Sequence, residues 1–385
     1  MQVFSRPRSH DFRSGKKIKI LYVCRNYHIG GAEAVVANLC RQIDKERFQV
    51  SLFHFMKERG MIGDELHEEG FETYCISSSR IPVLKYLTFF QLRKIVIEKE
   101  IDIVHSHCIH GLIDSALCKV SFPKLRHLHT FHFGNYPHIS KRYLALERFL
   151  CKIPDQLVAV GHEQRKVIMK TYGLPPERIL TVWNGVVSGR GGAAPEFLEK
   201  YGNRKGVIIG VIATLIEQKG LTDMLEVASE LKRRGVDAIF LVVGEGHLRK
   251  ELESKARDLA LGDTVQFLGW VMNAGSRILP LFDILFQPSL WEAMSIVVLE
   301  AMAGGKPIVA TDVGENRYMV EHGKNGFLVS PRDIASMAEA LETLTKNPDL
   351  LKRQGLESRK RFQEKFTSEA MVRKYDDLYA RLGSS

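Results

Sequence analysis

Short apolar runs alternate with longer amphipathic stretches along almost the whole chain. This alternation is typical of repeated strand–helix units, which build parallel sheets covered by helices. Thirteen runs have the length and composition of buried strands. They are residues 18–24, 49–55, 73–76, 101–105, 126–130, 156–160 and 179–182 in the first half, and 207–212, 239–243, 265–268, 283–286, 308–310 and 327–329 in the second. The pattern predicts an α/β fold.

A glycine-rich stretch separates the two groups of strands. Four glycines fall between Asn184 and Pro195, which is too many for regular structure, so residues 187–195 are predicted to be a linker. A length of 385 residues also favours two hydrophobic cores over one. We expect doubly wound domains at 18–186 and 196–366, facing each other across a cleft. The final helix, within 367–385, is expected to pack back toward the first domain.

The charge balance narrows the class of partner. The chain has 55 Lys and Arg against 45 Asp and Glu, a net charge of +10, which suits phosphate groups or an anionic membrane surface. The basic residues are scattered and no nucleic-acid-binding motif is present, so no nucleic-acid partner is expected. Residues 1–17 are predicted to be a basic, disordered leader. The chain shows no signal peptide, no membrane-spanning run and no paired cysteine motif, which together predict a cytoplasmic protein.

The most informative local pattern is the acidic run from Glu292 to Glu300. It lies between the predicted strands 283–286 and 308–310, at the sheet edge where open α/β folds bind ligands. Ser295 is a candidate N-cap for the following helix, whose free amides would face an anion. Two carboxylates beside an anion site suit a phosphorylated sugar, which offers hydroxyl groups and phosphate. The alternative is a partly buried helix that carries two surface acids.

Other motifs follow the predicted strands in order. They are Gly30-Gly31-Ala32-Glu33, residues 102–107, Thr130-Phe131-His132, Asn184-Gly185-Val186, Lys219-Gly220, Gly244-Glu245-Gly246, Phe267-Leu268-Gly269 and residues 323–329. With the acidic run, they resemble glycosyltransferase family 4, retaining enzymes of the two-domain GT-B fold. The resemblance covers the chain from about Ile18 to its end and is most specific in the carboxyl-terminal half.

This resemblance implies a nucleotide-sugar donor, expected to be a UDP-sugar, bound to the carboxyl-terminal domain. Glu300 would bind the ribose hydroxyls and Glu292 the hydroxyls of the transferred sugar. Lys219 would neutralise the departing diphosphate, which backbone amides at Gly30 and Gly31 would also approach. Further donor-site residues implied by the likeness are Thr214, Glu245, Gly246, Leu268, Met294, Ser295 and Ile296. The loops at Glu245 and at residues 268–270 would lie by the nucleoside.

One position departs from the family pattern. The family usually carries an arginine before the Lys-Gly pair, where this chain has Thr214. Losing a charged contact to a diphosphate costs about 1.5–3 kcal/mol unless another group replaces it. Arg25, in the loop after the first strand, is a candidate substitute and an acceptor-side candidate. The chain has no Asp-x-Asp run, so neither a metal ion nor another cofactor is expected.

Seven histidines cluster between His105 and His138. His132 matches the Thr-x-His motif of the family and is expected near the reacting carbon, as a catalytic residue. His107 is a further candidate on the acceptor side. The spacing His105-x-His107-Cys108 also suits metal ligands, because residues two apart on a strand share a face. No acidic partner or paired cysteine completes such a site, which favours histidines that line the cleft or the core.

Two segments of the first half, residues 80–99 and 136–151, mix basic and apolar side chains. Such helices bind anionic membrane surfaces, and they also occur as ordinary amphipathic helices packed on a sheet. A location at the inner face of the membrane would suit a lipid-linked acceptor.

The expected function is that of a retaining glycosyltransferase. It would transfer a sugar to a hydroxyl group of a glycan or lipid-linked acceptor, as in the synthesis of cell-surface polysaccharide. Two alternatives stay open from the sequence: a GT-B sugar-nucleotide epimerase or hydrolase that uses no acceptor, and a non-catalytic protein that binds sugar nucleotides.

Overall fold

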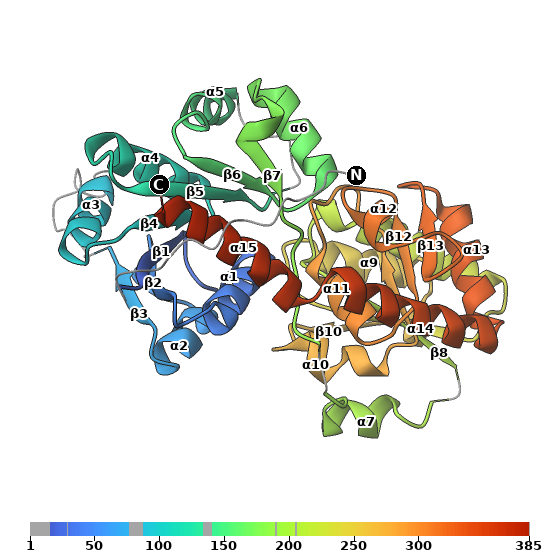
Figure 1. Cartoon of the computed structure of the whole chain (residues 1–385). Helices are drawn as coiled ribbons and strands as arrows, with labels where there is room; N and C mark the ends of the chain where they lie inside the picture. The colour runs from blue at the N-terminus through green and yellow to red at the C-terminus, as the bar shows by residue number, and fades with distance from the viewer. Residues whose placement is uncertain are drawn as a thin grey trace.

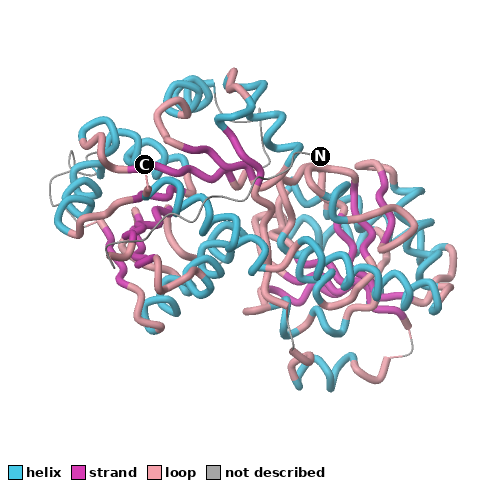
Figure 2. The backbone as a smooth tube through the Cα atoms, in the orientation of Figure 1, coloured by secondary structure: helices cyan, strands magenta, loops and turns pink. Residues whose placement is uncertain are grey.

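The computed structural model describes residues 16–28, 30–76, 88–133, 141–188, 191–204 and 206–384. These residues form two parallel sheets with helices packed around each (Figure 1). Figure 2 shows the strands inside each half and the helices outside them. The predicted basic leader lies outside the described residues, except for Lys16 and Lys17.

The first sheet has seven parallel strands in the order β3-β2-β1-β4-β5-β6-β7. The order reverses between β1 and β4, because the chain winds outward from this pair in both directions. Ligands of open α/β sheets bind at such a switch point. The strands are β1 Ile18–Cys24, β2 Phe48–His54, β3 Glu72–Cys75, β4 Ile103–Ser106, β5 Arg126–Phe131, β6 Gln156–Ala159 and β7 Ile179–Thr181.

The second sheet has six parallel strands in the order β10-β9-β8-β11-β12-β13. Its switch point lies between β8 and β11, so the loops that follow these two strands flank the second predicted ligand position. The strands are β8 Val207–Ile212, β9 Ala238–Val243, β10 Val265–Gly269, β11 Ile284–Gln287, β12 Ile308–Thr311 and β13 Gly326–Val329.

All thirteen predicted strands are confirmed, and their ends move by at most two residues. The largest difference is at β4, which was expected to start at Ile101. The amide of Ile101 instead donates to Val96 O and closes the preceding helix. The carboxylate of Asp102 accepts from the Lys19 amide at 2.8 Å, so these two residues belong to the turn that leads into β4.

Helices cover both faces of each sheet because successive strand residues point to opposite sides. In β1, Ile20 and Tyr22 pack with α1 on one face, whereas Leu21 and Val23 pack with α3 on the other. The helices of the first domain are α1 Gly31–Gln42, α2 Met61–Glu68, α3 Thr88–Glu98, α4 Ile109–Ser121, α5 Lys141–Leu150 and α6 His162–Tyr172. Those of the second are α7 Pro195–Tyr201, α8 Leu221–Arg233, α9 Arg249–Asp258, α10 Ala274–Arg277, α11 Ile296–Ala303, α12 Asn316–Met319, α13 Ile334–Thr345 and α14 Pro348–Lys365.

The last helix, α15 (Ser368–Gly383), packs against α1 of the first domain, although α14 belongs to the second (Figure 1). The chain therefore crosses between the domains twice. The two crossings lie side by side: the Val186 amide donates to Phe366 O at 3.3 Å, and the Ser368 amide donates to Val186 O at 2.9 Å. This short paired segment joins the two domains.

Candidate active site between the two domains

A cavity of about 840 Å³ lies between the two domains. Its wall comes from loops that follow β1 and β5 in the first domain and β8, β9, β10 and β11 in the second. These loops all lie at the carboxyl ends of parallel strands, which is where ligands bind in doubly wound folds. The cavity is therefore the candidate active site.

Most of the predicted site residues line this cavity, and four do not. The wall includes His132, Lys219, Glu292, Gly30, Gly31, Thr214, Glu245, Met294, Ser295, Ile296 and Glu300. Gly246, Leu268, Arg25 and His107 are not part of it. Gly244 occupies the position expected for Gly246. Of the loop 268–270, which is expected beside the nucleoside, Trp270 lines the cavity and Leu268 does not.

The N-termini of two helices face each other across this cavity. Gly31 is the first residue of α1 and Ile296 is the first residue of α11. A Cβ added to Gly31 would lie 3.2 Å from Ile296 Cγ1, so a larger side chain would press the two ends apart. The first amides of a helix have no partner within it and carry its positive partial charge. Two such ends that converge on one cavity favour an anion there.

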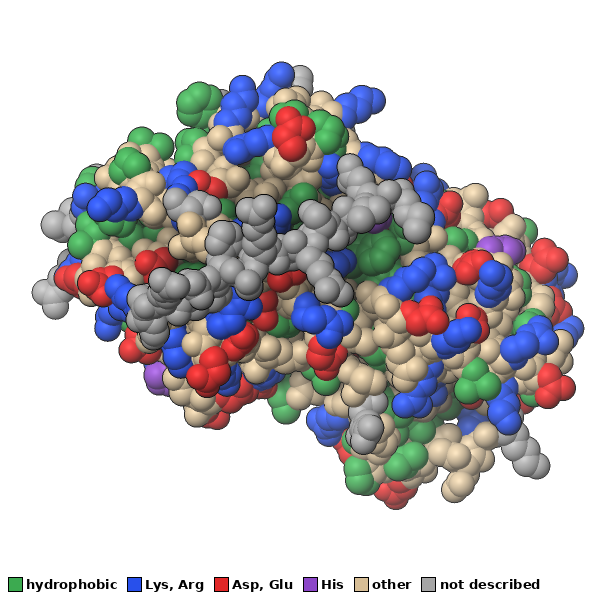
Figure 3. Space-filling model, viewed as in Figure 1, with side chains coloured by type: hydrophobic (Ala, Val, Ile, Leu, Met, Phe, Trp, Pro, Cys, Tyr) green, Lys and Arg blue, Asp and Glu red, His purple; other side chains and the backbone are tan. Residues whose placement is uncertain are grey.

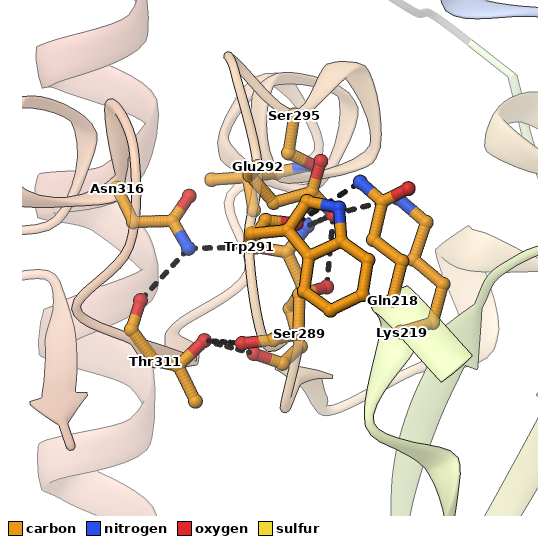
Figure 4. A network of polar contacts seen from close by, with 10 residues as sticks. Gln218, Lys219, Ser289, Trp291, Glu292, Ser295, Thr311 and Asn316 are labelled. Carbon is orange, nitrogen blue, oxygen red and sulfur yellow. Dashed lines mark hydrogen bonds and ion pairs between the residues drawn. The ribbon is translucent and has the colours of Figure 1, made fainter. Parts of the chain in front are cut away.

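Ser295 is the N-cap of α11, as predicted. Its hydroxyl accepts a hydrogen bond from the Val298 amide at 3.4 Å. Gln287, at the end of β11, donates to the same hydroxyl at 2.6 Å, and the Asn316 amide donates to the side-chain oxygen Oε1 of Gln287 at 3.0 Å. This buried chain fixes the direction in which the helix enters the cavity (Figure 4).

Lys219 and Glu292 form a close ion pair, with Lys219 Nζ 2.6 Å from Glu292 Oε1 (Figure 4). Ser289 donates to the same carboxylate oxygen at 2.8 Å. The Glu292 side chain is only 7% exposed and that of Lys219 23%, so water screens the pair weakly. The ammonium group of Lys219 is thus held beside the convergent helix ends.

Tight backbone contacts hold this loop in place. Gly220 has a positive φ of 62°, and a Cβ there would lie 2.0 Å from Pro288 O. Gly314 also has a positive φ, of 52°, and a Cβ there would lie 2.3 Å from Glu292 O. Gly220 and Gly314 are therefore required, because the backbone of a neighbouring loop approaches each of them too closely for a residue with a Cβ atom.

Glu300 lies in the second turn of α11 and lines the cavity. Burial raises the pKa of its carboxyl group to about 7. Gly275 of α10 packs directly against it, since a Cβ at Gly275 would lie 2.7 Å from Glu300 Cδ. Among the described residues no hydrogen bond to this carboxyl group is found. Its acceptor oxygens are therefore available to hydroxyl groups of a ligand.

His132 follows β5 and forms the wall on the side of the first domain. Its Nε2 lies 2.9 Å from Nδ1 of His107, which follows β4. Burial lowers the pKa of His132 to about 4, so the ring is neutral near pH 7. His107 is not on the cavity wall, where an acceptor-side residue would be expected. It lies behind His132.

The missing arginine at Thr214 is not replaced by Arg25. Thr214 lines the cavity, whereas Arg25 lies on the exposed loop after β1. Burial of His110, and after it the nearby charge of Arg25, lower the pKa of His110. Within the described part of the chain, the Lys and Arg side chains that line the cavity are Lys219 and Arg41. Arg41 is paired with two glutamates of the first domain, Glu65 at 3.1 Å and Glu69 at 2.6 Å. Lys219 is paired with the single carboxylate of Glu292 and so keeps more of its positive charge for a ligand than Arg41, which also lies in the last turn of α1, away from the N-terminus of that helix.

Three further histidines of the cluster, His105, His127 and His129, have hydrogen-bond partners within the protein. His105 Nδ1 lies 2.7 Å from the Tyr379 hydroxyl, and its Nε2 lies 2.8 Å from Thr130 Oγ1. His127 and His129 both contact the Ser106 hydroxyl at 2.8 Å. The described residues contain no group of three His, Cys, Asp or Glu side chains arranged to hold a metal ion.

Several lining residues were not predicted from the sequence. They are Asn184, Gln218, Val271, Met272, Asn273, Ala274 and Gly275 in the linker region and second domain, and Glu33, Ala37, Arg41, Met61, Ile62, Glu65 and Phe133 in the first. A usable signal existed for residues 271–275, because this segment continues the predicted loop 268–270. The contacts of α1 and α2 depend on how the domains face each other, which no local motif specifies.

Comparisons with known proteins agree with this geometry. The model of Glycosyltransferase Family 4 matches residues 29–190, and the model of Glycosyl transferases group 1 matches residues 195–364. An Escherichia coli relative, UDP-Gal:alpha-D-GlcNAc-diphosphoundecaprenol alpha-1,3-galactosyltransferase, is 28% identical over 384 residues, covering 94% of this chain and 97% of the relative. The Escherichia coli O-antigen chain mannosyltransferase C is 26% identical over 389 residues, covering 95% and 99%.

The fold is also that of solved structures. The crystal structure of Anabaena HepE in complex with UDP and glucose has a TM-score of 0.83 at 19% identity and covers 94% of this chain and all of its own. Sucrose-phosphate synthase from Thermosynechococcus elongatus has a TM-score of 0.83 at 18% identity. The predicted fold and family are confirmed. With its two Rossmann-like domains, the chain belongs to glycosyltransferase family 4 and is a glycosyltransferase of the GT-B fold.

Proposed function

We propose that this glycosyltransferase transfers a sugar from a UDP-sugar to a hydroxyl group of a glycan or lipid-linked acceptor, with retention of the anomeric configuration. The observation that carries the proposal is the convergence of the α1 and α11 N-termini beside Lys219 in one cavity. Two helix ends and one ammonium group match the negative charge of a diphosphate.

The two glutamates set the direction in which a sugar nucleotide would lie in this cavity. Glu292 lies next to Lys219, close to the diphosphate position, and would bind hydroxyls of the transferred sugar. Glu300 lies one turn into α11, beside Gly275, and would bind the ribose hydroxyls. The nucleoside then extends toward Glu245 and Trp270.

The chemistry needs stabilisation of a leaving group. The bond between the anomeric carbon and the diphosphate oxygen breaks while the acceptor oxygen bonds to the same face of that carbon. The acceptor hydroxyl gives its proton to the departing diphosphate oxygen, so no protein base is required. Lys219 and the helix amides stabilise the negative charge where it develops, and they are already in place before the reaction.

The relatives support the choice of donor and acceptor. The name of the Escherichia coli galactosyltransferase specifies UDP-Gal as donor and a diphosphoundecaprenol-linked sugar as acceptor, and Anabaena HepE was crystallised with UDP and with UDP-glucose. The first of these aligns over nearly the full length of both chains.

A lipid-linked acceptor also suits the surface of the first domain. On α5, Leu146 and Phe149 are 41% and 69% exposed and flank the exposed Arg148. Figure 3 shows lysine, arginine and hydrophobic side chains together at the top of the molecule, where Figure 1 places α5 and α6. No helix among the described residues is long and apolar enough to span a bilayer. We therefore propose peripheral contact of α5 with an anionic membrane at its inner face.

A vesicle sedimentation assay tests this contact. Phe149→Ser should reduce binding to vesicles that contain phosphatidylglycerol. Leu356→Ser is the matched control, because Leu356 is 65% exposed on α14 of the other domain. Equal binding of both variants and the original protein would contradict the contact.

The reaction is tested with UDP-galactose, UDP-glucose and UDP-N-acetylglucosamine, each with and without a polyprenyl-diphosphate sugar acceptor. We expect UDP release that depends on the acceptor, and a product whose new linkage keeps the donor's anomeric configuration by NMR. Lys219→Ala should lower kcat about 100-fold, whereas Lys324→Ala, at an exposed surface pair, should not. Donor hydrolysis or epimerisation that proceeds equally without acceptor would overturn the proposal, as would binding without turnover on any acceptor.

A further inference from the structure

The ring of His132, which lines the cavity, packs against a second histidine, His107, which does not line it. The two residues follow neighbouring parallel strands, β4 and β5, and their rings stack with centroids 5.2 Å apart and an angle of 30°. His107 Nδ1 lies 2.9 Å from His132 Nε2. This hydrogen bond occupies one ring nitrogen of His132 and leaves Nδ1 as the nitrogen available to a ligand in the cavity.

The ring of His107 is fixed on its other sides. The His105 ring lies 3.9 Å away and the Tyr22 ring 5.8 Å away, centroid to centroid. His105 is itself held through both nitrogens, by the Tyr379 hydroxyl of α15 and by Thr130 of β5. His107 is 3% exposed. Because His107 cannot turn, the direction of its hydrogen bond to His132 is set by where its proton resides.

The location of that proton follows from the burial of His107 Nε2. This nitrogen is buried and has no hydrogen-bond partner among the described residues. A neutral imidazole carries one N–H group and one acceptor nitrogen, and orphaned buried N–H groups are rarer than under-satisfied acceptors. The proton therefore lies on Nδ1, and His107 donates to Nε2 of His132. His132 must then carry its own proton on Nδ1.

Neither ring is positively charged near neutral pH. Burial, with the neighbouring His105, His132 and His129, lowers the pKa of His107 well below its usual range. The Tyr22 ring, which lies against His107, has a pKa raised well above the ordinary tyrosine value by burial, so it is neutral as well. Both imidazoles are therefore neutral, and the N–H group of His132 that is not bonded to His107 is the donor available to the cavity.

We propose that His107 is a positioning residue that fixes the tautomer of His132, so that His132 offers an N–H donor at Nδ1 to an oxygen of the bound sugar nucleotide and is not a base. The identity of that oxygen rests on the proposed function, whereas the tautomer does not. This assignment also explains why the leaving diphosphate, and not a side chain, receives the acceptor's proton.

Histidine 15N NMR tests the tautomer without any substrate. His132→Gln identifies the signals of His132 by their disappearance. We expect the unsubstituted protein to show Nδ1 of His132 protonated and Nε2 unprotonated, and His107→Asn to preserve this state, since an asparagine amide can donate from the position of Nδ1. His107→Asp, of equal size but only an acceptor when ionised, should move the proton to Nε2. An Nε2–H tautomer of His132 in the unsubstituted protein would overturn the inference.

Transfer kinetics then test the consequence. His107→Asp should lower kcat about 100-fold, as loss of one donor aimed at developing charge does, with little change in the KM for donor, while His107→Asn keeps most of the activity. His127→Asn is the control for damage to a buried histidine, because His127 contacts Ser106 and not His132. Equal losses in all three variants would overturn the role of His107. An inactive unsubstituted protein with the expected tautomer would contradict the proposed function alone.

Discussion

Burial of the Glu300 carboxyl group makes this single residue a determinant of how stability depends on pH. Its pKa is about 7 in the folded protein, compared with about 4.3 in an unfolded chain. Between these values the unfolded chain releases a proton that the folded protein keeps, so the free energy of unfolding falls as pH rises and levels off above about 7. At neutral pH the unfavourable contribution is at most about 3 kcal/mol.

Glu300→Gln should therefore raise the melting temperature at pH 8, and this gain should disappear at pH 4.5. Glu321→Gln is the control of opposite sign, because Lys324 holds the pKa of Glu321 below its usual value, so its ionised form stabilises the fold. Thermal unfolding of both variants from pH 4.5 to 8.5 measures the difference. A Glu300→Gln variant that is less stable than the original protein at pH 8 would contradict the burial of this carboxyl group.

Thr214 is the residue at which the sequence departs most clearly from its family, and among the described residues the cavity wall holds no other Lys or Arg than Lys219 and Arg41 to replace the missing charge. Thr214→Arg should add a charged contact to the diphosphate, worth about 1.5 kcal/mol, or roughly tenfold tighter UDP binding. Thr214→Gln adds length without charge and should leave the affinity nearly unchanged. Calorimetric titration compares the two. Equal affinity in both variants would mean that the diphosphate does not approach this loop.

At the scale of elements, the turn between Lys219 and α8 is fixed by the backbone of a neighbouring loop. Gly220 and Gly235 both have positive φ, at 62° and 68°, but only Gly220 faces an obstacle, Pro288 O. Gly235→Ala should lower the free energy of unfolding only by the strain of a non-glycine residue in the left-handed conformation, about 1–2 kcal/mol. Gly220→Ala should lower the free energy of unfolding by more than this. Because it displaces Lys219, it should also weaken UDP binding. Equal effects of both variants on stability and on UDP affinity would contradict the packing of this turn.

The elements themselves were largely predictable, because each depends on local chemistry. Apolar runs identified every strand, and Ser295 identified the start of α11 through the preference of serine for helix N-caps. The packing of Gly275 against Glu300 and the hydrogen bond between His107 and His132 were not predictable. Both join residues whose distance is set by how strands and loops meet in three dimensions, which periodicity does not encode.

At the scale of the whole molecule, a buried carboxylate of the second domain ties it to the first. Glu315 accepts from the Glu163 amide of α6 at 2.7 Å and from Trp183 Nε1 at 2.8 Å, and its side chain is fully buried. A carboxylate at the N-terminus of α6 is favoured by the unpaired amides of that helix.

Glu315→Gln should weaken this contact, because an amide has only one acceptor oxygen for two donors. We expect a loss of about 1–3 kcal/mol in the free energy of unfolding and a larger radius of gyration by small-angle scattering. Glu339→Gln, at an exposed position of α13, should change neither. An unchanged scattering curve and unchanged stability of Glu315→Gln would show that the domains are held by other contacts.

The central claim is that the cavity binds a nucleoside diphosphate through Lys219 and the two helix N-termini. Calorimetric titration of the protein with UDP and with uridine tests it most directly, since the two ligands differ only in the diphosphate. We predict that UDP binds at least 100-fold more tightly than uridine, which corresponds to about 2.7 kcal/mol. Equal affinities for UDP and uridine, or no binding of UDP, would contradict the account.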